Sequence, residues 1–290
     1  MSKIKKKLII GTTQFYKRYG LSRTKIHRKE AKKLIKFLRK KNLLYFDDAL
    51  SYNFSKTLKD LKINGKNFKL TTKIPKYDGN PNYEKKALDM LTKNLIKSNL
   101  KKYDSILLHD TMGLNKSEII NSISFLKKLK RKHITKKIGF SLYHKKDFYS
   151  LRKHLKPDVI QAPVNIFDQD FLESSFRKKL EKEKITFYAR SIFLQGLLIT
   201  DKIPKYFKKI EPSIRLWNSF CKKNKVSKID GCLNFVNNQS FIKKIIIGVK
   251  SVKEVNQILD FKKKNIVFEK KFKNLKLQKK YTKPYLWQKN

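Results

Sequence analysis

Short apolar runs recur along the chain, each bounded by turn residues or by charged residues. The runs are four to seven residues long and rich in β-branched or aromatic side chains, which is typical of strands that are buried on both faces of a sheet. Positions 265–268 carry the weakest of these patterns. The predicted strands cover residues 43–48, 69–74, 105–110, 137–142, 159–163, 186–192, 244–249 and 265–268.

Longer stretches with a different spacing separate these runs. Their apolar residues stand three or four positions apart on otherwise basic segments, which predicts amphipathic helices that bury the apolar stripe and turn their lysines to solvent. The predicted helices cover residues 30–40, 83–99, 116–132, 145–154, 171–184, 214–224 and 252–261.

Strand and helix alternate about eight times in 290 residues, which is the signature of a (β/α)8 barrel of ordinary length. We therefore predict one parallel eight-stranded barrel domain over 1–290, with a core at about 8–270, a short N-terminal strand or hairpin segment and a basic C-terminal extension over 271–290. A doubly wound sheet is the alternative. It would bind a dinucleotide through a Gly-rich first turn, but no two of the nine glycines stand two positions apart.

The charge balance is unusual, since 72 Lys and Arg residues against 23 Asp and Glu residues give a formal net charge of +49. Such an excess is typical of proteins that bind nucleic acid or membrane surfaces. Only nine of the basic residues are arginine, however, and the lysines are spread along the whole chain. This skew resembles drift towards A/T-rich codons. We therefore interpret most of the charge as compositional background and expect no specific nucleic-acid partner.

Other partners and compartments are constrained by what the sequence lacks. It has no apolar run long enough for a signal sequence or a membrane span. Cys221 and Cys232 lie eleven positions apart, which fits neither a zinc site nor a disulfide framework, and both are expected to face the core from helices. The five histidines form no i, i+4 ligand pair. These features predict no metal and favour a reducing, cytoplasmic location.

Candidate chemistry lies where the predicted strands end, which is where function collects in a barrel of this type. Asp47 and Asp48 stand at one strand end with Tyr52 just beyond, the next strand ends in Lys73, and the third ends in His109. A lysine cation beside a tyrosine favours phenolate and lowers the pKa of the phenol. The carboxylate would hold the lysine charged, and the imidazole can hydrogen-bond a carbonyl and help relay a proton.

At these residues the sequence resembles the aldo/keto reductases. FDDALSY over 46–52 is similar to the family's F-x-D-T-A-x-x-Y-G, and GTTQF over 11–15 with RYG over 18–20 looks like the family's opening segment. The resemblance extends over roughly residues 8–260. The further motifs, in family order, are TTK over 71–73, LLHD over 107–110, IGFS over 138–141, DVIQAPVNIFDQ over 158–169, ARSIFLQGLL over 189–198 and IIIGVKS over 245–251.

The resemblance implies a role for each member of the constellation. Asp47 lies five positions before Tyr52 and matches the family's aspartate, whereas Asp48 takes the place of its threonine and is interpreted as a cap or structural carboxylate. Tyr52 would be the general acid, Lys73 the partner that lowers its pKa, Asp47 the support of Lys73, and His109 the residue that orients the substrate.

The resemblance also implies a nicotinamide cofactor, bound extended across the barrel mouth without a Rossmann fold. Ser141 and Gln161 match the positions that hold the carboxamide, and Arg190 matches the residue that stacks on the nicotinamide ring. Lys250 and Ser251 match the adenosine 2′-phosphate site, and because a cation with a hydroxyl suits a phosphate dianion, NADPH is expected in preference to NADH. The other implied cofactor residues are Gln195, Gly196 and Leu197 of the pyrophosphate loop, with Gly11, Thr12 and Gly248.

Three departures from the family pattern bear on the cofactor and on loop geometry. Asn53 replaces the glycine that usually follows the tyrosine, Leu142 stands where many members have an asparagine, and the arginine often found after the Lys-Ser pair is not evident. None of them removes a member of the catalytic set.

The expected function is reduction of an aldehyde or ketone with NADPH, the proton coming from Tyr52. Members with a GTTQF-like start are, by resemblance, often bacterial and associated with surface-sugar pathways, which suggests a sugar-derived carbonyl substrate. A catalytically idle NADPH-binding barrel that acts as a sensor or interaction subunit is the alternative, followed by a basic nucleic-acid-binding protein. The expected partner is a small-molecule carbonyl compound, the membrane is not expected to take part, and the chain is expected as a monomer or weak dimer.

Overall fold

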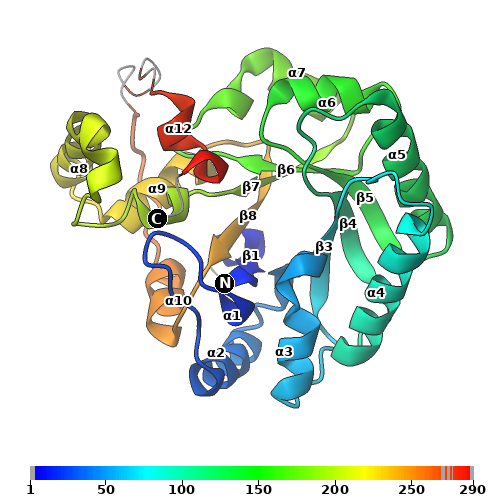
Figure 1. Ribbon diagram of the computed structural model, residues 1–290. Helices are drawn as coiled ribbons and strands as arrows, with labels where there is room; N and C mark the ends of the chain where they lie inside the picture. The colour runs from blue at the N-terminus through cyan, green and yellow to red at the C-terminus, as the bar shows by residue number, and fades with distance from the viewer. Residues whose placement is uncertain (1–3, 269–271, 273–274, 276, 288–290) are drawn as a thin grey trace.

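Eight parallel strands close into a barrel in the computed structural model, which describes residues 4–268, 272, 275 and 277–287 (Figure 1). Each strand pairs with its neighbours in sequence, and the first pairs with the last. The predicted (β/α)8 barrel is therefore confirmed. The strands are β1 (Leu8–Gly11), β2 (Tyr45–Asp47), β3 (Lys69–Ile74), β4 (Tyr103–Leu108), β5 (Thr135–Ser141), β6 (Val159–Pro163), β7 (Thr186–Arg190) and β8 (Ile242–Gly248).

The barrel closes through its N-terminal strand, which corrects the predicted strand set. Leu8 pairs with Ile245 and Gly11 with Gly248, so β1 is a full member of the barrel and not a separate strand or hairpin segment. Residues 265–268, predicted as the eighth strand, have no strand structure, and the Val267 side chain is 86% exposed. Since β8 already pairs with β7 and β1, no edge is left for this segment.

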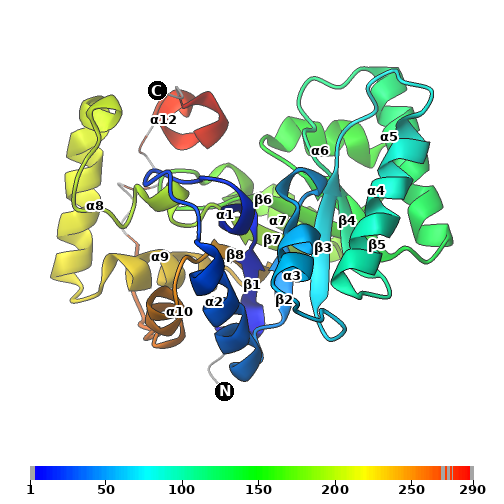
Figure 2. The ribbon, with the colours of Figure 1, turned by 60° about the horizontal axis from the view of Figure 1, so that its bottom comes forward.

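Helices surround the strands, as the side view in Figure 2 shows. Most begin and end within a few residues of the predicted bounds, but the apolar spacing did not predict α1, α3, α9 or α12. None of the helices in the described part of the chain combines the length and apolar character that crossing a membrane requires. The helices are α1 (Thr13–Tyr16), α2 (Arg28–Lys40), α3 (Phe54–Asp60), α4 (Tyr83–Ser98), α5 (Lys116–Arg131), α6 (Lys145–Arg152), α7 (Ser174–Lys182), α8 (Glu211–Lys223), α9 (Lys228–Asn237), α10 (Val252–Leu259) and α12 (Lys279–Thr282).

The interior of the barrel is packed, which leaves its carboxyl end for a site. A small apolar cluster fills the centre, with Ile9, Leu107 and Val159 fully buried. Below it, at the amino ends of the strands, the Tyr45 hydroxyl hydrogen-bonds the Asp104 carboxylate and lies 3.1 Å from the Tyr188 hydroxyl. These residues close the amino end of the barrel with satisfied polar groups.

The lysines occupy solvated positions, as the helical pattern predicts. Among the described residues, only Lys73 and Lys283 are buried lysines, and each forms a salt bridge with a buried aspartate. Cys221 and Cys232 lie on α8 and α9 as buried free thiols, so the prediction that both face the core from helices is confirmed.

The C-terminal segment packs back onto the barrel. The structure describes 272, 275 and 277–287 of the predicted basic extension, and its other positions lie outside the described residues. Lys283 joins Asp168 and Asp170 with Nζ–O distances of 2.8 and 2.9 Å. Tyr285 then packs edge-on against Tyr143, with ring centroids 4.4 Å apart. As Figure 2 shows, α12 lies on the same side of the barrel as α1, which directly follows β1.

Candidate active site

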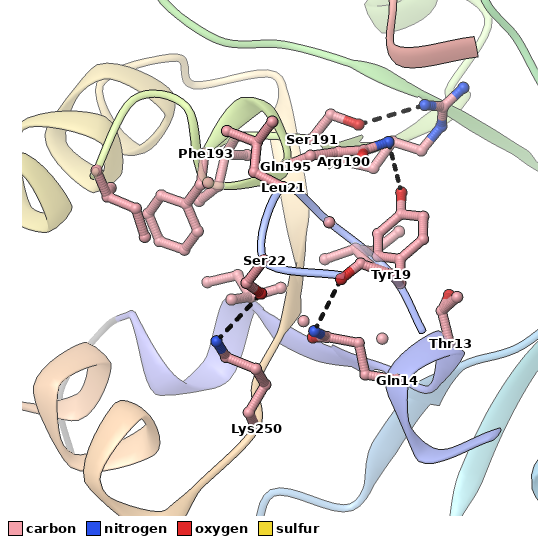
Figure 3. Close-up of a pocket in the computed structure, with 18 of the residues that line it drawn as sticks. Thr13, Gln14, Tyr19, Leu21, Ser22, Arg190, Ser191, Phe193, Gln195 and Lys250 are labelled. Atoms are coloured by element: carbon pink, nitrogen blue, oxygen red, sulfur yellow. Dashed lines mark hydrogen bonds between the residues drawn. The ribbon is translucent and has the colours of Figure 1, made fainter. Parts of the chain in front are cut away.

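A cavity of about 680 Å³ opens at the carboxyl ends of the strands. Asp47, Tyr52, Lys73 and His109 all line it, so the structure brings together the four residues for which the sequence predicts catalytic roles. All the predicted cofactor residues also line the cavity except Thr12, Leu197 and Ser251. Figure 3 shows the part of the cavity wall formed by α1, the segment that follows it, the loop after β7 and Lys250.

The floor of this site is a buried ion pair between β2 and β3. Lys73 Nζ lies 2.8 Å from Asp47 Oδ2 and donates a second hydrogen bond of 2.7 Å to the Asp48 carbonyl oxygen. The other Asp47 oxygen accepts a hydrogen bond of 2.7 Å from the Gln161 amide. All of these side chains are buried. Because both charges are paired and hydrogen-bonded, the pair can stay ionised out of water.

Tyr52 and His109 face the cavity above this pair. Their ring centroids are 6.3 Å apart, and Lys73 Nζ lies 5.8 Å from the centre of the Tyr52 ring. Burial, together with the negative charge of Asp47, raises the pKa of Tyr52 to about 12. The net shift is therefore opposite to the lowered pKa expected for this tyrosine, because burial outweighs the effect of a lysine that is already paired with Asp47. The phenol is protonated at neutral pH and has a proton to donate.

The His109 imidazole is neutral across the physiological range. Burial lowers its pKa to about 3, and the positive charges of Lys73, Arg190 and Lys17 act in the same direction. A neutral imidazole can donate one hydrogen bond and accept another. It can therefore hydrogen-bond a carbonyl oxygen beside the phenol without adding a charge to the site.

The low pKa of His109 is expected to make the protein lose stability in mild acid. Below a pH of about 6.5 the unfolded chain protonates this histidine while the folded protein does not, so the free energy of unfolding falls as the pH falls. Replacing His109 with asparagine removes this contribution. Urea denaturation at pH 6.5 and pH 5 should show that the wild type loses about 1–2 kcal/mol more than His109→Asn does. Equal losses in the two proteins would show that His109 is protonated in the folded state.

The carboxamide positions lie beside the ion pair, on β5 and β6. Ser141 Oγ donates to Gln161 Oε1 at 3.4 Å, and the Gln161 amide is fixed by Asp47. Arg190, at the end of β7, places its guanidinium 4.2 Å from the centre of the Tyr143 ring and donates to the Leu142 carbonyl oxygen at 3.0 Å. These contacts hold its planar group at the cavity wall.

A segment that follows α1 crosses the mouth of the cavity between the loop after β7 and the loop after β8. Figure 3 shows Tyr19 between Thr13 and Gln14 on one side and Gln195 on the other. The Tyr19 hydroxyl accepts a 3.3 Å hydrogen bond from the Gln195 amide, and Leu21 N donates to the Gln195 carbonyl oxygen at 3.0 Å. This segment therefore bridges the cavity and is fastened to the loop after β7.

The same segment also reaches the loop after β8. Lys250 Nζ lies 3.5 Å from the Ser22 hydroxyl and 3.7 Å from Glu254 Oε1. Glu254 also accepts a hydrogen bond of 2.7 Å from the Lys250 backbone N–H. Lys250 therefore faces the cavity between a hydroxyl and a carboxylate, at the end of the cavity away from Arg190 (Figure 3).

The three predicted residues outside the cavity lining have structural surroundings. Thr12 is buried and donates a hydrogen bond of 2.6 Å to Asp48 Oδ1. Leu197 is fully buried in the core, and Ser251 caps α10 by accepting the Glu254 N–H. Asp48 is buried as well, and burial raises its pKa to about 7. This placement agrees with the interpretation of Asp48 as a structural carboxylate.

Sequence reasoning did not assign Lys17, Tyr19, Tyr143 or Glu254 to the site. Tyr19, Tyr143 and Glu254 line the cavity, and Lys17 Nζ lies 4.8 Å from the centre of the Tyr52 ring. Tyr19 belongs to the RYG that follows the GTTQF segment, and Tyr143 directly follows the IGFS motif and Leu142. Their position beside these motifs is the only feature of the sequence that indicates a place in the site.

Comparisons with known proteins fit this geometry. The family model of the aldo/keto reductase family matches residues 7–274. A search of curated proteins found no significant match. Among solved structures, the holo form of the aldo-keto reductase AKR11C1 from Bacillus halodurans matches with a TM-score of 0.73 and 13% identity, over 98% of this chain and 94% of that chain.

Two further solved structures share the fold. The glycerol dehydrogenase AKR11B4 from Gluconobacter oxydans has a TM-score of 0.67 and 16% identity, over 92% of this chain and 89% of that chain. An aldo/keto reductase from Brucella melitensis has a TM-score of 0.61 and 20% identity, over 92% of each chain. At these identities the structural likeness concerns the fold, whereas the family model matches the sequence over most of its length. The chain belongs to the aldo/keto reductase family.

Proposed function

We propose that this oxidoreductase reduces an aldehyde or ketone to an alcohol with NADPH. One observation carries the proposal: a protonated phenol, Tyr52, and a neutral imidazole, His109, face the same cavity above the buried Asp47–Lys73 pair. Two uncharged hydrogen-bond donors at one wall of a cavity can receive a carbonyl oxygen and stabilise the negative charge that develops on it.

The residues around the cavity fit a nicotinamide dinucleotide. A volume of about 680 Å³ is in the range of cofactor sites. Ser141 and Gln161 offer a hydroxyl and an amide, which are suitable partners for a carboxamide. Gly196 has a φ of +103°, and a Cβ there would meet nothing within 4 Å, so the backbone of this loop is open to a close ligand. Lys250 supplies a cation for a phosphate.

Each catalytic side chain has a separate task in this proposal. Ser141 and Gln161 would hold a reduced nicotinamide, which would supply a hydride for the carbonyl carbon. Tyr52 donates its phenolic proton to the carbonyl oxygen, and His109 orients that oxygen through a hydrogen bond. The Lys73 ammonium, held by Asp47, stabilises the phenolate that is left on Tyr52. Because the phenol has a high pKa in the resting site, this stabilisation matters most in the transition state.

The cofactor preference is expected to depend on Lys250. Titration of tryptophan fluorescence with NADPH should show binding, and Lys250→Gln should weaken it about tenfold, because the variant loses a charged hydrogen bond to the 2′-phosphate. NADH, which has no such phosphate, should bind the variant and the wild type equally. NADPH oxidation with a panel of aldehydes, ketones and keto sugars then tests the reaction itself.

Lys253→Gln is the matched control, since Lys253 lies three residues further on, in the first turn of α10, and does not line the cavity. Its affinity for NADPH should equal that of the wild type. An equal loss in both lysine variants would make the effect one of overall charge. Binding of NADPH without turnover of any carbonyl would favour the idle barrel over the enzyme.

The proposed partner is a small carbonyl compound. The free, buried Cys221 and Cys232 support a reducing compartment such as the cytoplasm. On the ground of the family resemblance, a sugar-derived ketone is the proposed carbonyl compound.

A further inference from the structure

Two cations near the end of the cavity that holds Tyr52 and Arg190, namely Lys17 and Arg190 itself, have no acidic partner among the described residues. Lys17 does not line the cavity, but its ammonium lies 4.8 Å from the centre of the Tyr52 ring, which does. The Arg190 guanidinium lies over the Tyr143 ring and bonds a carbonyl and a hydroxyl. Within the described part of the chain, neither cation forms a salt bridge.

The acidic side chains near the mouth are engaged elsewhere. Asp47 is paired with Lys73 at 2.8 Å, and Asp168 and Asp170 are paired with Lys283. Asp48 accepts a hydrogen bond from Thr12, and burial favours its neutral form. The electrostatic balance at the catalytic end is therefore positive. Burial is the main cause of the lowered pKa of His109, and the charges of Lys73, Arg190 and Lys17 lower it further.

The proposed cofactor leaves these charges unmatched. Its phosphates are assigned to Gln195 and Lys250, and in Figure 3 Lys250 lies at the opposite end of the cavity from Arg190. The ring of a reduced nicotinamide carries no negative charge that could neutralise Lys17. The remaining group that enters this end of the cavity is the substrate.

We propose that the substrate is a carbonyl compound with a carboxylate or phosphate close to the carbonyl, and that Lys17 determines this specificity by binding the anionic group. The inference rests on the proposed reduction at Tyr52, because it assumes that the carbonyl lies against that phenol. With the oxygen at Tyr52 and an ammonium above the same ring, an anion within a few bonds of the carbonyl reaches Lys17. Arg190, which lines the cavity, adds a second positive charge at this end.

Matched substrate pairs test the specificity. Pyruvate and methyl pyruvate share the same ketone and differ in charge, and glyceraldehyde 3-phosphate and glyceraldehyde form the phosphate pair. The wild type should favour the charged member in kcat/KM. Lys17→Gln should reduce that preference about tenfold, mainly through KM, because it removes a charge-assisted hydrogen bond. The neutral members should change less than twofold. The pair whose charged member loses more of its preference in Lys17→Gln identifies the anion as carboxylate or phosphate.

Lys25→Gln separates the local effect from the general charge of the protein. Lys25 lies on the same segment and over another tyrosine, with its ammonium 5.6 Å from the centre of the Tyr16 ring, but away from the cavity. This control removes the same charge and should leave the substrate preference unchanged. An equal drop in both variants would mean that the whole charged surface attracts anions, and would overturn the proposal.

Two further outcomes also overturn it. In the first, the wild type reduces both members of each pair equally well, so the proposed function stands while the specificity does not. In the second, Lys17→Gln slows the neutral and charged members by the same factor, which would make Lys17 a stabiliser of the reaction itself. If no carbonyl is reduced, the proposed function fails, and calorimetry with lactate and methyl lactate tests the anion site alone. Loss of a preference for the acid in Lys17→Gln would support the site, and absence of any preference would refute it.

Discussion

Replacing Tyr52 with phenylalanine is expected to lower kcat for carbonyl reduction by about 10²–10⁴-fold, because the variant keeps the ring but loses the proton donor. The fluorescence titration with NADPH should change little, since the lost hydroxyl belongs to the catalytic end of the cavity. Stopped-flow measurement of NADPH oxidation in a single turnover gives the rate of the chemical step directly. With the pKa of Tyr52 at about 12, the wild-type rate should stay level as the pH rises from 6 to 9.

Tyr19→Phe provides the matched control for this substitution. Tyr19 also lines the cavity, but its hydroxyl is bonded to the Gln195 amide. Its removal should alter KM for the cofactor more than the rate of hydride transfer. If Tyr52→Phe kept the rate of the wild type, the proton would have to come from another group, and Tyr19 and Tyr143 would be the next residues to test.

Replacing Lys283 with methionine is expected to destabilise the fold by about 3–5 kcal/mol, the usual consequence of leaving one member of a buried ion pair without its partner. The Asp168 side chain is 1% exposed, and both of its oxygens contact Lys283. Burial alone would lower the pKa of Lys283, but Asp168 and Asp170 raise it, so the ammonium is charged throughout the range of the assay. Urea denaturation at pH 7 measures the change.

The reverse substitution, Asp168→Asn, is expected to be milder. It leaves Lys283 with Asp170 at 2.9 Å, a carboxylate that is 45% exposed and needs no buried partner. The double variant should recover part of the stability that Lys283→Met loses, because no buried charge remains. Lys279→Met, on an exposed lysine of the same segment, should stay within about 0.5 kcal/mol of the wild type. Similar losses in the Lys283 and Lys279 variants would argue against a structural role for the ion pair.

The barrel strands could be predicted where apolar residues form an uninterrupted run. Residues 69–74 and 159–163 have the predicted bounds. β1 was predicted only as a separate N-terminal strand or hairpin segment, because its four residues lie beside a basic terminus and are short on their own. Residues 265–268 have a similar composition and form no strand. The two segments differ because β1 pairs with the edge of β8, whereas residues 265–268 find no free edge in the closed barrel. This difference is a property of the barrel and not of either segment.

In the candidate site, too, the sequence predicted some residues and not others. Asp47, Lys73 and His109 stand at or next to strand ends, so periodicity and topology placed them together before any distance was known. Lys17 and Tyr19 belong to a segment without periodic pattern, and their positions depend on long-range contacts such as those with Gln195. The direction of the Tyr52 pKa shift also depended on the folded structure, since burial of the phenol raises it and the charge of Asp47 adds to the rise.

The pairing of β1 with β8 sets an order on folding. Leu8 and Ile245 form one rung of the barrel although almost the whole chain separates them. Contacts of such long sequence separation form late, because a large loop must close first. During synthesis, β1 cannot pair on this side until β8 has been synthesised. Its apolar residues stay without this partner until then. The strongly basic surface keeps nascent copies apart through like-charge repulsion during that interval.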